Sequence, residues 1–235
     1  MGLPASISVA LFDLDGVLTS TTALHRKAWK QTFDAYLRVR DGDDFVPFTE
    51  TDYLKYVDGR PRGDGVRAFL GSRHVEVTDE LVEGIGTRKN QVILASLKRG
   101  EIEPYPGSVR YLVAAREADL RVGVVTSSEN GSAMLEAVDL SRFVQARIDG
   151  TDIVRLRLRG KPAPDSFLAG AQAFGVHPCS AAVFEDALSG VQAATAGEFG
   201  YVVGVDRVGG SEHAAALRAA GADVVVTDLA ELLPP

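Results

Sequence analysis

ISVALFDLDGVLT (residues 7–19) joins a short apolar run to two acidic residues and a glycine. The apolar part, residues 7–12, predicts a buried strand, which Asp13 and Asp15 follow at once. Similar apolar segments recur at residues 121–128, 181–186, 201–205 and 223–227, and helical patterns separate them. Strands that alternate with helices in this way predict an α/β fold with a parallel sheet covered on both faces.

Residues 21–103 have a different character, because their apolar spacing is helical throughout. The segments with this spacing are TTALHRKAWKQTFDAYL (21–37), DYLKYV (52–57), GVRAFLGS (65–72) and DELVEGIGTRKNQVILASL (79–97). The stretch EPYPG (103–107) then marks the return to the α/β pattern. We therefore expect a core made of residues 1–20 and 104–235, with residues 21–103 inserted as a helical cap domain.

Composition excludes several classes of protein. The chain has 235 residues, with 25 Lys and Arg against 32 Asp and Glu, and a formal net charge of −7. An acidic chain without a basic tract argues against nucleic acid as a partner. The first apolar run ends at Asp13, which is too soon for a membrane span or signal peptide. Cys179 has no second cysteine to pair with, which fits a reducing compartment and predicts a cytoplasmic protein.

Polar residues stand at the predicted carboxyl ends of strands or just before helices. They are Asp13, Asp15, Thr126, Lys161, Glu185 and Asp186. In an open parallel sheet these strand ends meet at one crevice, where ligands bind. Four carboxylates against one lysine leave a surplus of negative charge that would raise their pKa values. Mg²⁺ would reduce this surplus, and its preference for oxygen ligands suits a carboxylate cluster.

This set of groups favours phosphoryl transfer. A carboxylate can attack phosphorus and form an aspartyl-phosphate. The transferred group carries charge on three oxygens, so a lysine, a hydroxyl and backbone N–H groups must surround it. A second aspartate two residues further on can pass a proton to or from the leaving oxygen.

DLDGVLT (13–19), the threonine after a strand, GKPAPD (160–165) and FEDALSG (184–190) resemble the four motifs of the haloacid dehalogenase superfamily. The resemblance covers essentially the whole chain and is greatest to the β-phosphoglucomutase branch. It implies a Rossmann-like parallel sheet with an inserted helical cap. By this resemblance Asp13 is the nucleophile, Asp15 is the general acid/base, and Thr126 and Lys161 hold the transferring phosphate. The resemblance further implies that Mg²⁺ is bound by Asp13, the Asp15 carbonyl and Asp186, and that Glu185 supports these ligands.

The same branch suggests substrate contacts outside the four motifs. LHRKAW (24–29) resembles its His-x-x-x-Trp helix, DGRPR (58–62) its distal phosphate arginine, RKN (88–90) a Lys-Asn pair, and SSEN (127–130) a phosphate loop. The substrate-binding residues implied are His25, Trp29, Arg62, Lys89, Ser128 and Asn130. The chain departs from the branch at Asp58 and Glu129, each of which stands where the branch has a lysine.

Two enzymatic functions remain open at this point. The first is a sugar phosphate mutase that converts β-glucose 1-phosphate to glucose 6-phosphate, with a sugar 1,6-bisphosphate as activator. The second is a sugar-phosphate phosphatase with the same nucleophile and a path for water. His25, Arg62 and Lys89 favour the mutase, whereas Asp58 and Glu129 weaken it. A phospho-aspartate receiver ranks far below, because it has no large cap. We expect a monomer that acts on a small phosphorylated sugar.

Overall fold

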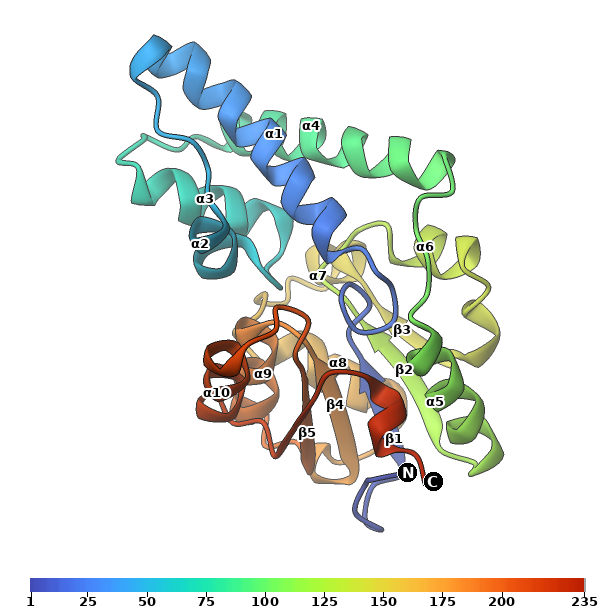
Figure 1. Cartoon of the computed structure of the whole chain (residues 1–235). Helices are drawn as coiled ribbons and strands as arrows, with labels where there is room; N and C mark the ends of the chain where they lie inside the picture. Colours follow the sequence, from blue (N-terminus) through green and yellow to red (C-terminus); the bar gives the residue numbers. More distant parts are fainter. Residues whose placement is uncertain (235) are drawn as a thin grey trace.

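A computed structural model describes residues 1–234 and contains one parallel sheet of six strands. The strands are β1 (Val9–Phe12), β2 (Arg121–Val125), β3 (Ala146–Ile148), β4 (Ala181–Glu185), β5 (Tyr201–Val205) and β6 (Val224–Val226). Their order across the sheet is β3-β2-β1-β4-β5-β6, and every neighbouring pair is parallel. The predicted α/β class is therefore confirmed, and β1 lies at the centre of the sheet (Figure 1).

Helices cover both faces of this sheet. They are α5 (Pro106–Glu117), α6 (Gly131–Ala137), α7 (Gly150–Arg155), α8 (Asp165–Ala173), α9 (Leu188–Ala196) and α10 (Ser211–Ala219). Ala10 and Phe12 of β1 belong to a core that includes residues of α5 and α6. Val9 and Leu11 belong to a second core with residues of α8 and α9. Since both faces of β1 are covered, all four of its residues are apolar and fully buried.

One strand is absent from the sequence prediction. β3 has only the sequence ARI (146–148) and lies at the edge of the sheet beside β2. Its residues Ala146 and Arg147 are partly exposed, so it lacks the apolar run that marks the central strands. A segment this short and polar gives no periodic signal, which is why the sequence did not reveal it.

Residues 21–103 fold into helices above the carboxyl edge of the sheet (Figure 1). These are α1 (Thr22–Asp41), α2 (Glu50–Asp52), α3 (Arg62–Ser72) and α4 (Asp79–Lys98). DYLKYV, predicted as an ordinary helix, instead forms the end of α2 and a π-helical turn at Tyr53–Val57. The helices share a separate apolar core, in which the rings of Phe33 and Phe69 lie 4.3 Å apart.

The chain leaves and re-enters the sheet region through two adjacent segments. Ser20 N donates to Glu103 O at 2.9 Å, and Tyr105 N donates to Leu18 O at 3.0 Å. The outgoing and returning connecting segments therefore lie side by side beneath the helices. Among the described residues, none of the helices is both long and apolar enough to cross a membrane.

Candidate active site

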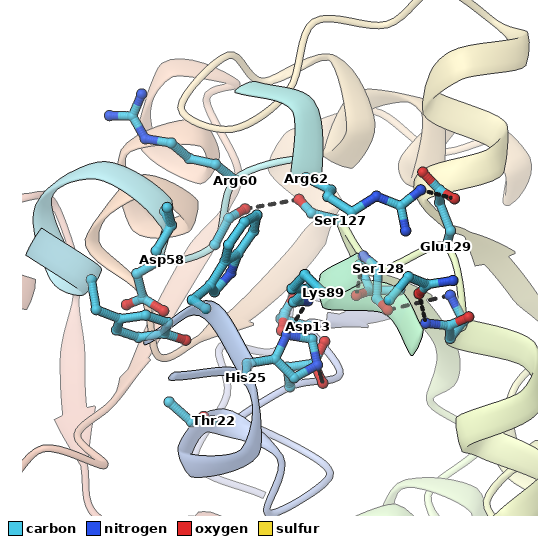
Figure 2. Close-up of a pocket in the computed structure, with 18 of the residues that line it drawn as sticks. Asp13, Thr22, His25, Asp58, Arg60, Arg62, Lys89, Ser127, Ser128 and Glu129 are labelled. Carbon is cyan, nitrogen blue, oxygen red and sulfur yellow. Dashed lines mark hydrogen bonds and ion pairs between the residues drawn. The ribbon is translucent and has the colours of Figure 1, made fainter. Parts of the chain in front are cut away.

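A pocket lies between the carboxyl edge of the sheet and the helices of residues 21–103 (Figure 2). Its lining includes ten of the twelve residues predicted for the site: Asp13, Asp15, His25, Trp29, Arg62, Lys89, Thr126, Ser128, Asn130 and Asp186. The other two, Lys161 and Glu185, are buried directly behind Asp13. The pocket encloses a cavity of about 60 Å³, which has room for a few water molecules.

Three neighbouring strands bring the core residues together. Asp13 follows β1, Thr126 follows β2, and Asp186 follows β4. The hydrogen bonding between the parallel strands continues into the site, because Asp13 N donates to Phe184 O and Thr126 N donates to Ile148 O, both at 2.9 Å. Gly16 turns the chain behind the aspartates with a φ of +83°, and a Cβ there would lie 1.8 Å from Asp186 Oδ2. Both the turn and the closeness of Asp186 therefore require glycine.

Lys161 connects two of the predicted acidic residues. Its Nζ donates to Asp13 Oδ1 at 2.6 Å and also to Glu185 Oε1. Burial lowers the pKa of Lys161, but the two carboxylates outweigh burial and raise it above its usual range. Glu185 Oε2 accepts a hydrogen bond from Ala187 N at 2.9 Å, so this carboxylate is fully used within the protein. Glu185 thus holds Lys161 in place and is not among the residues that line the pocket.

Asp186 and Asp13 fit a divalent cation. Burial raises the pKa of Asp186, and the nearby carboxylates of Asp58 and Glu185 raise it further. Thr22 Oγ1 donates to Asp186 at 3.4 Å, but within residues 1–234 no lysine, arginine or histidine pairs with it. Burial also raises the pKa of Asp13, although Lys161 opposes the rise. A cation between the two carboxylates would keep both ionised.

The donor set fits Mg²⁺ better than a metal held wholly by side chains. In residues 1–234 no three His, Cys, Asp or Glu side chains are grouped to hold a metal ion. Mg²⁺ is commonly bound through one or two carboxylates and completes its shell with water and substrate phosphate. The carboxylates of Asp13 and Asp186 line the pocket and could hold it here, and the family resemblance adds the backbone carbonyl of Asp15.

A chain of polar contacts runs from Asp15 into the helices. His25 Nε2 lies 3.3 Å from Asp15 Oδ1, and Lys89 Nζ lies 3.1 Å from His25 Nδ1. Burial lowers the pKa of His25 to about 4 and that of Lys89 to about 8. Because a lysine ammonium can only donate, Nδ1 accepts from it and the imidazole proton is on Nε2. Nε2 is buried and forms no hydrogen bond within residues 1–234, although Asp15 Oδ1 lies nearby. Lys89 Nζ also lies 5.2 Å from the centre of the Trp29 ring.

The far end of the pocket joins the two parts of the protein. Arg62 Nη2 lies 2.6 Å from Glu129 Oε2. Ser127 Oγ donates to the Gly59 carbonyl at 2.8 Å (Figure 2). Asn130 Nδ2 donates to Asn90 Oδ1 at 2.7 Å. Ser127, Glu129 and Asn130 all follow β2. Their partners are Gly59, which precedes α3, Arg62 of α3 and Asn90 of α4.

Sequence reasoning did not identify Tyr53 as a site residue. Tyr53 lines the pocket together with Asp58, and burial and the nearby Asp58 carboxylate raise the pKa of Tyr53 well above its usual range. Burial raises the pKa of Asp58 to about 7. In the sequence Tyr53 has the spacing of an ordinary packing residue, and the π-helical turn that carries it has no sequence signature. Arg60 and Thr22 also line the pocket without having been predicted.

Comparison with known proteins agrees with this geometry. A model of haloacid dehalogenase-like hydrolases matches residues 7–197. A β-phosphoglucomutase of Mycobacterium tuberculosis is 52% identical over 246 residues, which covers 99% of this chain and 94% of that protein. A hydrolase structure from Pseudomonas syringae has a TM-score of 0.81 at 25% identity and covers 96% of this chain and 95% of that one. A β-phosphoglucomutase structure from Clostridium difficile has a TM-score of 0.79 at 22% identity, with 97% and 93% coverage.

The family match spans the strands that carry Asp13, Thr126 and Asp186, as well as the helices above them. The fold of the neighbours is the same along almost the entire length. The chain therefore belongs to the family of haloacid dehalogenase-like hydrolases.

Proposed function

We propose that this enzyme is a Mg²⁺-dependent phosphomutase that converts β-glucose 1-phosphate to glucose 6-phosphate through a phosphoryl group carried on Asp13. The observation that carries the proposal is the arrangement of the pocket, which has polar groups suited to a phosphate at each of two ends. Asp13 and Thr126 line one end, with Lys161 buried behind Asp13, and Arg62 lines the other end. A mutase needs both ends, because its sugar bisphosphate carries two phosphates at once. The 52% identity to the Mycobacterium tuberculosis β-phosphoglucomutase supports the same substrate.

The residues divide the chemistry as follows. The Asp13 carboxylate attacks phosphorus, while the Lys161 ammonium and the Thr126 hydroxyl hold the phosphoryl oxygens. Bound Mg²⁺ would supply positive charge to the phosphoryl oxygens and to the nucleophile. Asp15 takes the proton from the attacking sugar hydroxyl and returns one to the leaving oxygen. His25, whose Nε2 lies 3.3 Å from Asp15 Oδ1, would help to position that carboxylate beside the sugar.

The size of the cavity bears on how substrate enters. About 60 Å³ holds a few water molecules and not a sugar phosphate. We therefore propose that residues 21–103 act as a cap that moves away from the core of residues 1–20 and 104–235 to admit substrate. Closure then excludes water, which would otherwise hydrolyse the aspartyl-phosphate. A sugar 1,6-bisphosphate would prime the enzyme by phosphorylating Asp13.

A cytoplasmic location is part of the same proposal. Cys179 is exposed and free among the described residues, as a reducing compartment allows. Phosphorylated sugars are charged metabolites that are retained inside cells, so the substrate class points to the same compartment.

A two-channel assay tests the proposed activity. The enzyme is given Mg²⁺ and β-glucose 1-phosphate with a trace of the 1,6-bisphosphate, and glucose 6-phosphate and free phosphate are followed together. The proposal predicts that glucose 6-phosphate forms faster than phosphate is released. Free phosphate alone would contradict the mutase and establish the phosphatase alternative. One observation favours the phosphatase: Glu129 already pairs with Arg62, the residue proposed to bind the second phosphate.

A further inference from the structure

The ion pair between Arg62 and Glu129 joins the two parts of the protein across the distal end of the pocket (Figure 2). Arg62 is the first residue of α3, and Glu129 lies between β2 and α6. Their side chains are 24% and 34% exposed, so a ligand can reach both. The two groups also line the same pocket.

Glu129 is directed at the pocket by close packing of its stem. A Cβ on Gly150 would lie 2.8 Å from Glu129 Cγ and 2.8 Å from Glu129 N, so only a glycine leaves room for the side chain there. Gly150 N in turn donates to the Ser128 carbonyl at 3.0 Å, which fixes the loop that carries Glu129. Arg62 is placed in a similar way, because its Nε would be 3.1 Å from a Cβ on Gly86 of α4.

A carboxylate and a phosphate are alternative partners for one guanidinium, since both present paired oxygens to its N–H groups. The pair with Glu129 therefore uses the group that would hold a distal phosphate. Lys89, another cation of the pocket lining, is already engaged by His25 and the Trp29 ring. A phosphate that binds Arg62 must either displace the Glu129 carboxylate or bind next to this second negative charge.

We propose that Glu129 is a specificity-determining residue that competes with the distal phosphate for Arg62 and so lowers the affinity of the pocket for sugar bisphosphates. This inference rests on the proposed function, in which Arg62 binds the phosphate that is not being transferred. It differs from a positioning role, in which Glu129 would hold Arg62 ready and its loss would weaken binding.

Equilibrium binding separates these two roles. The Asp13→Asn variant, which lacks the nucleophile, is titrated calorimetrically with glucose 1,6-bisphosphate and Mg²⁺, alone and combined with Glu129→Gln. Gln keeps the size of Glu and removes its charge. Because exposed ion pairs contribute about 0.2–1 kcal/mol, we expect Kd to fall by about 1.4- to fivefold. Adding salt should reduce the difference in Kd between the proteins with and without the Glu129→Gln change, since screening weakens the ion pair between Arg62 and Glu129.

The matched control is Glu117→Gln, which makes the same change in net charge at the exposed end of α5, away from the pocket. It should leave Kd unchanged. An equal or weaker affinity of the Glu129→Gln variant would overturn the inference.

An Arg62→Ala background distinguishes failure of this inference from failure of the proposed function. If Glu129 acts by occupying Arg62, Glu129→Gln should have no effect once Arg62 is removed. If Arg62→Ala alone leaves bisphosphate affinity unchanged, the proposed role of Arg62 itself is wrong. If Arg62→Ala weakens binding but Glu129→Gln does not strengthen it, only the competition is wrong.

Discussion

Lys161 is the residue on which the charge balance of the site depends. It is 2% exposed and contacts two carboxylates, of which Glu185 is fully buried. Removing one partner from a buried ion pair leaves a charge without compensation, which commonly costs about 3–5 kcal/mol. Lys161→Met should therefore lower the free energy of unfolding by about that amount in urea denaturation without Mg²⁺. The double variant Lys161→Met/Glu185→Gln should recover part of the loss, and a single variant as stable as wild type would contradict this account.

Two residues with shifted pKa values predict how substrate binding depends on pH. Burial raises the pKa of Asp58 to about 7 and lowers that of Lys89 to about 8. As pH rises, Asp58 gains a negative charge and Lys89 loses a positive one, so both changes disfavour a dianionic substrate. The KM for β-glucose 1-phosphate should rise by about tenfold between about pH 6.5 and 9. Asp58→Asn should remove the part of the rise near neutral pH, and an unchanged profile in that variant would count against the role of Asp58.

Residues next to strand ends could be predicted from the sequence, and those placed by irregular backbone could not. Asp13, Thr126 and Asp186 meet because β1, β2 and β4 are adjacent and parallel; the alternation of strands and helices predicted the parallel sheet, and the structure supplies the strand order. Tyr53 enters the pocket through a π-helical turn, for which the sequence holds no periodic signal. The pairing of Arg62 with Glu129 depends on how α3 sits over the sheet, which is a tertiary property.

Among the elements, we expect the fit of the loop before α3 on the core to control the proposed closure of the pocket. Gly160, just before Lys161, faces this loop, and a Cβ on it would lie 2.1 Å from Pro61 Cγ. The rigid proline ring cannot yield, so Gly160→Ala should push the loop and α3 away from the core. Because misplacement by about 1 Å can reduce catalysis by about 10²-fold, we expect kcat/KM to fall by at least tenfold.

Gly71→Ala is the matched control for this prediction. Gly71 lies within α3, and a Cβ there would meet nothing within 4 Å. Alanine is the better helix former by about 0.5–1 kcal/mol, so this variant should be slightly more stable and keep wild-type kcat/KM. A similar kcat/KM for both alanine variants would show that the contact of Pro61 with the core does not matter.

For the protein as a whole, we expect the buried acidic cluster to make stability depend on Mg²⁺. Without Mg²⁺, the raised pKa of Asp186 means that its ionised form is disfavoured in the fold, so Asp186→Asn should unfold at a higher temperature than wild type at pH 8. With Mg²⁺ at about 100 times its Kd, wild type should gain about 2.7 kcal/mol, or roughly 5–10 °C in Tm. The variant should gain much less. Thermal unfolding in EDTA and in Mg²⁺ measures the Tm of each protein without and with metal. An equal Mg²⁺-induced rise in Tm for wild type and Asp186→Asn would exclude Asp186 as a ligand.

In the proposed function, Asp13 accepts a phosphoryl group and transfers it to a sugar. The most direct measurement is a label chase. The enzyme is phosphorylated with radiolabelled acetyl phosphate and Mg²⁺, and unlabelled β-glucose 1-phosphate is then added. We predict labelled protein that is lost in Asp13→Asn, and label that passes to glucose 1,6-bisphosphate and glucose 6-phosphate. Label that appears only in free phosphate, or labelling that survives in Asp13→Asn, would contradict the claim.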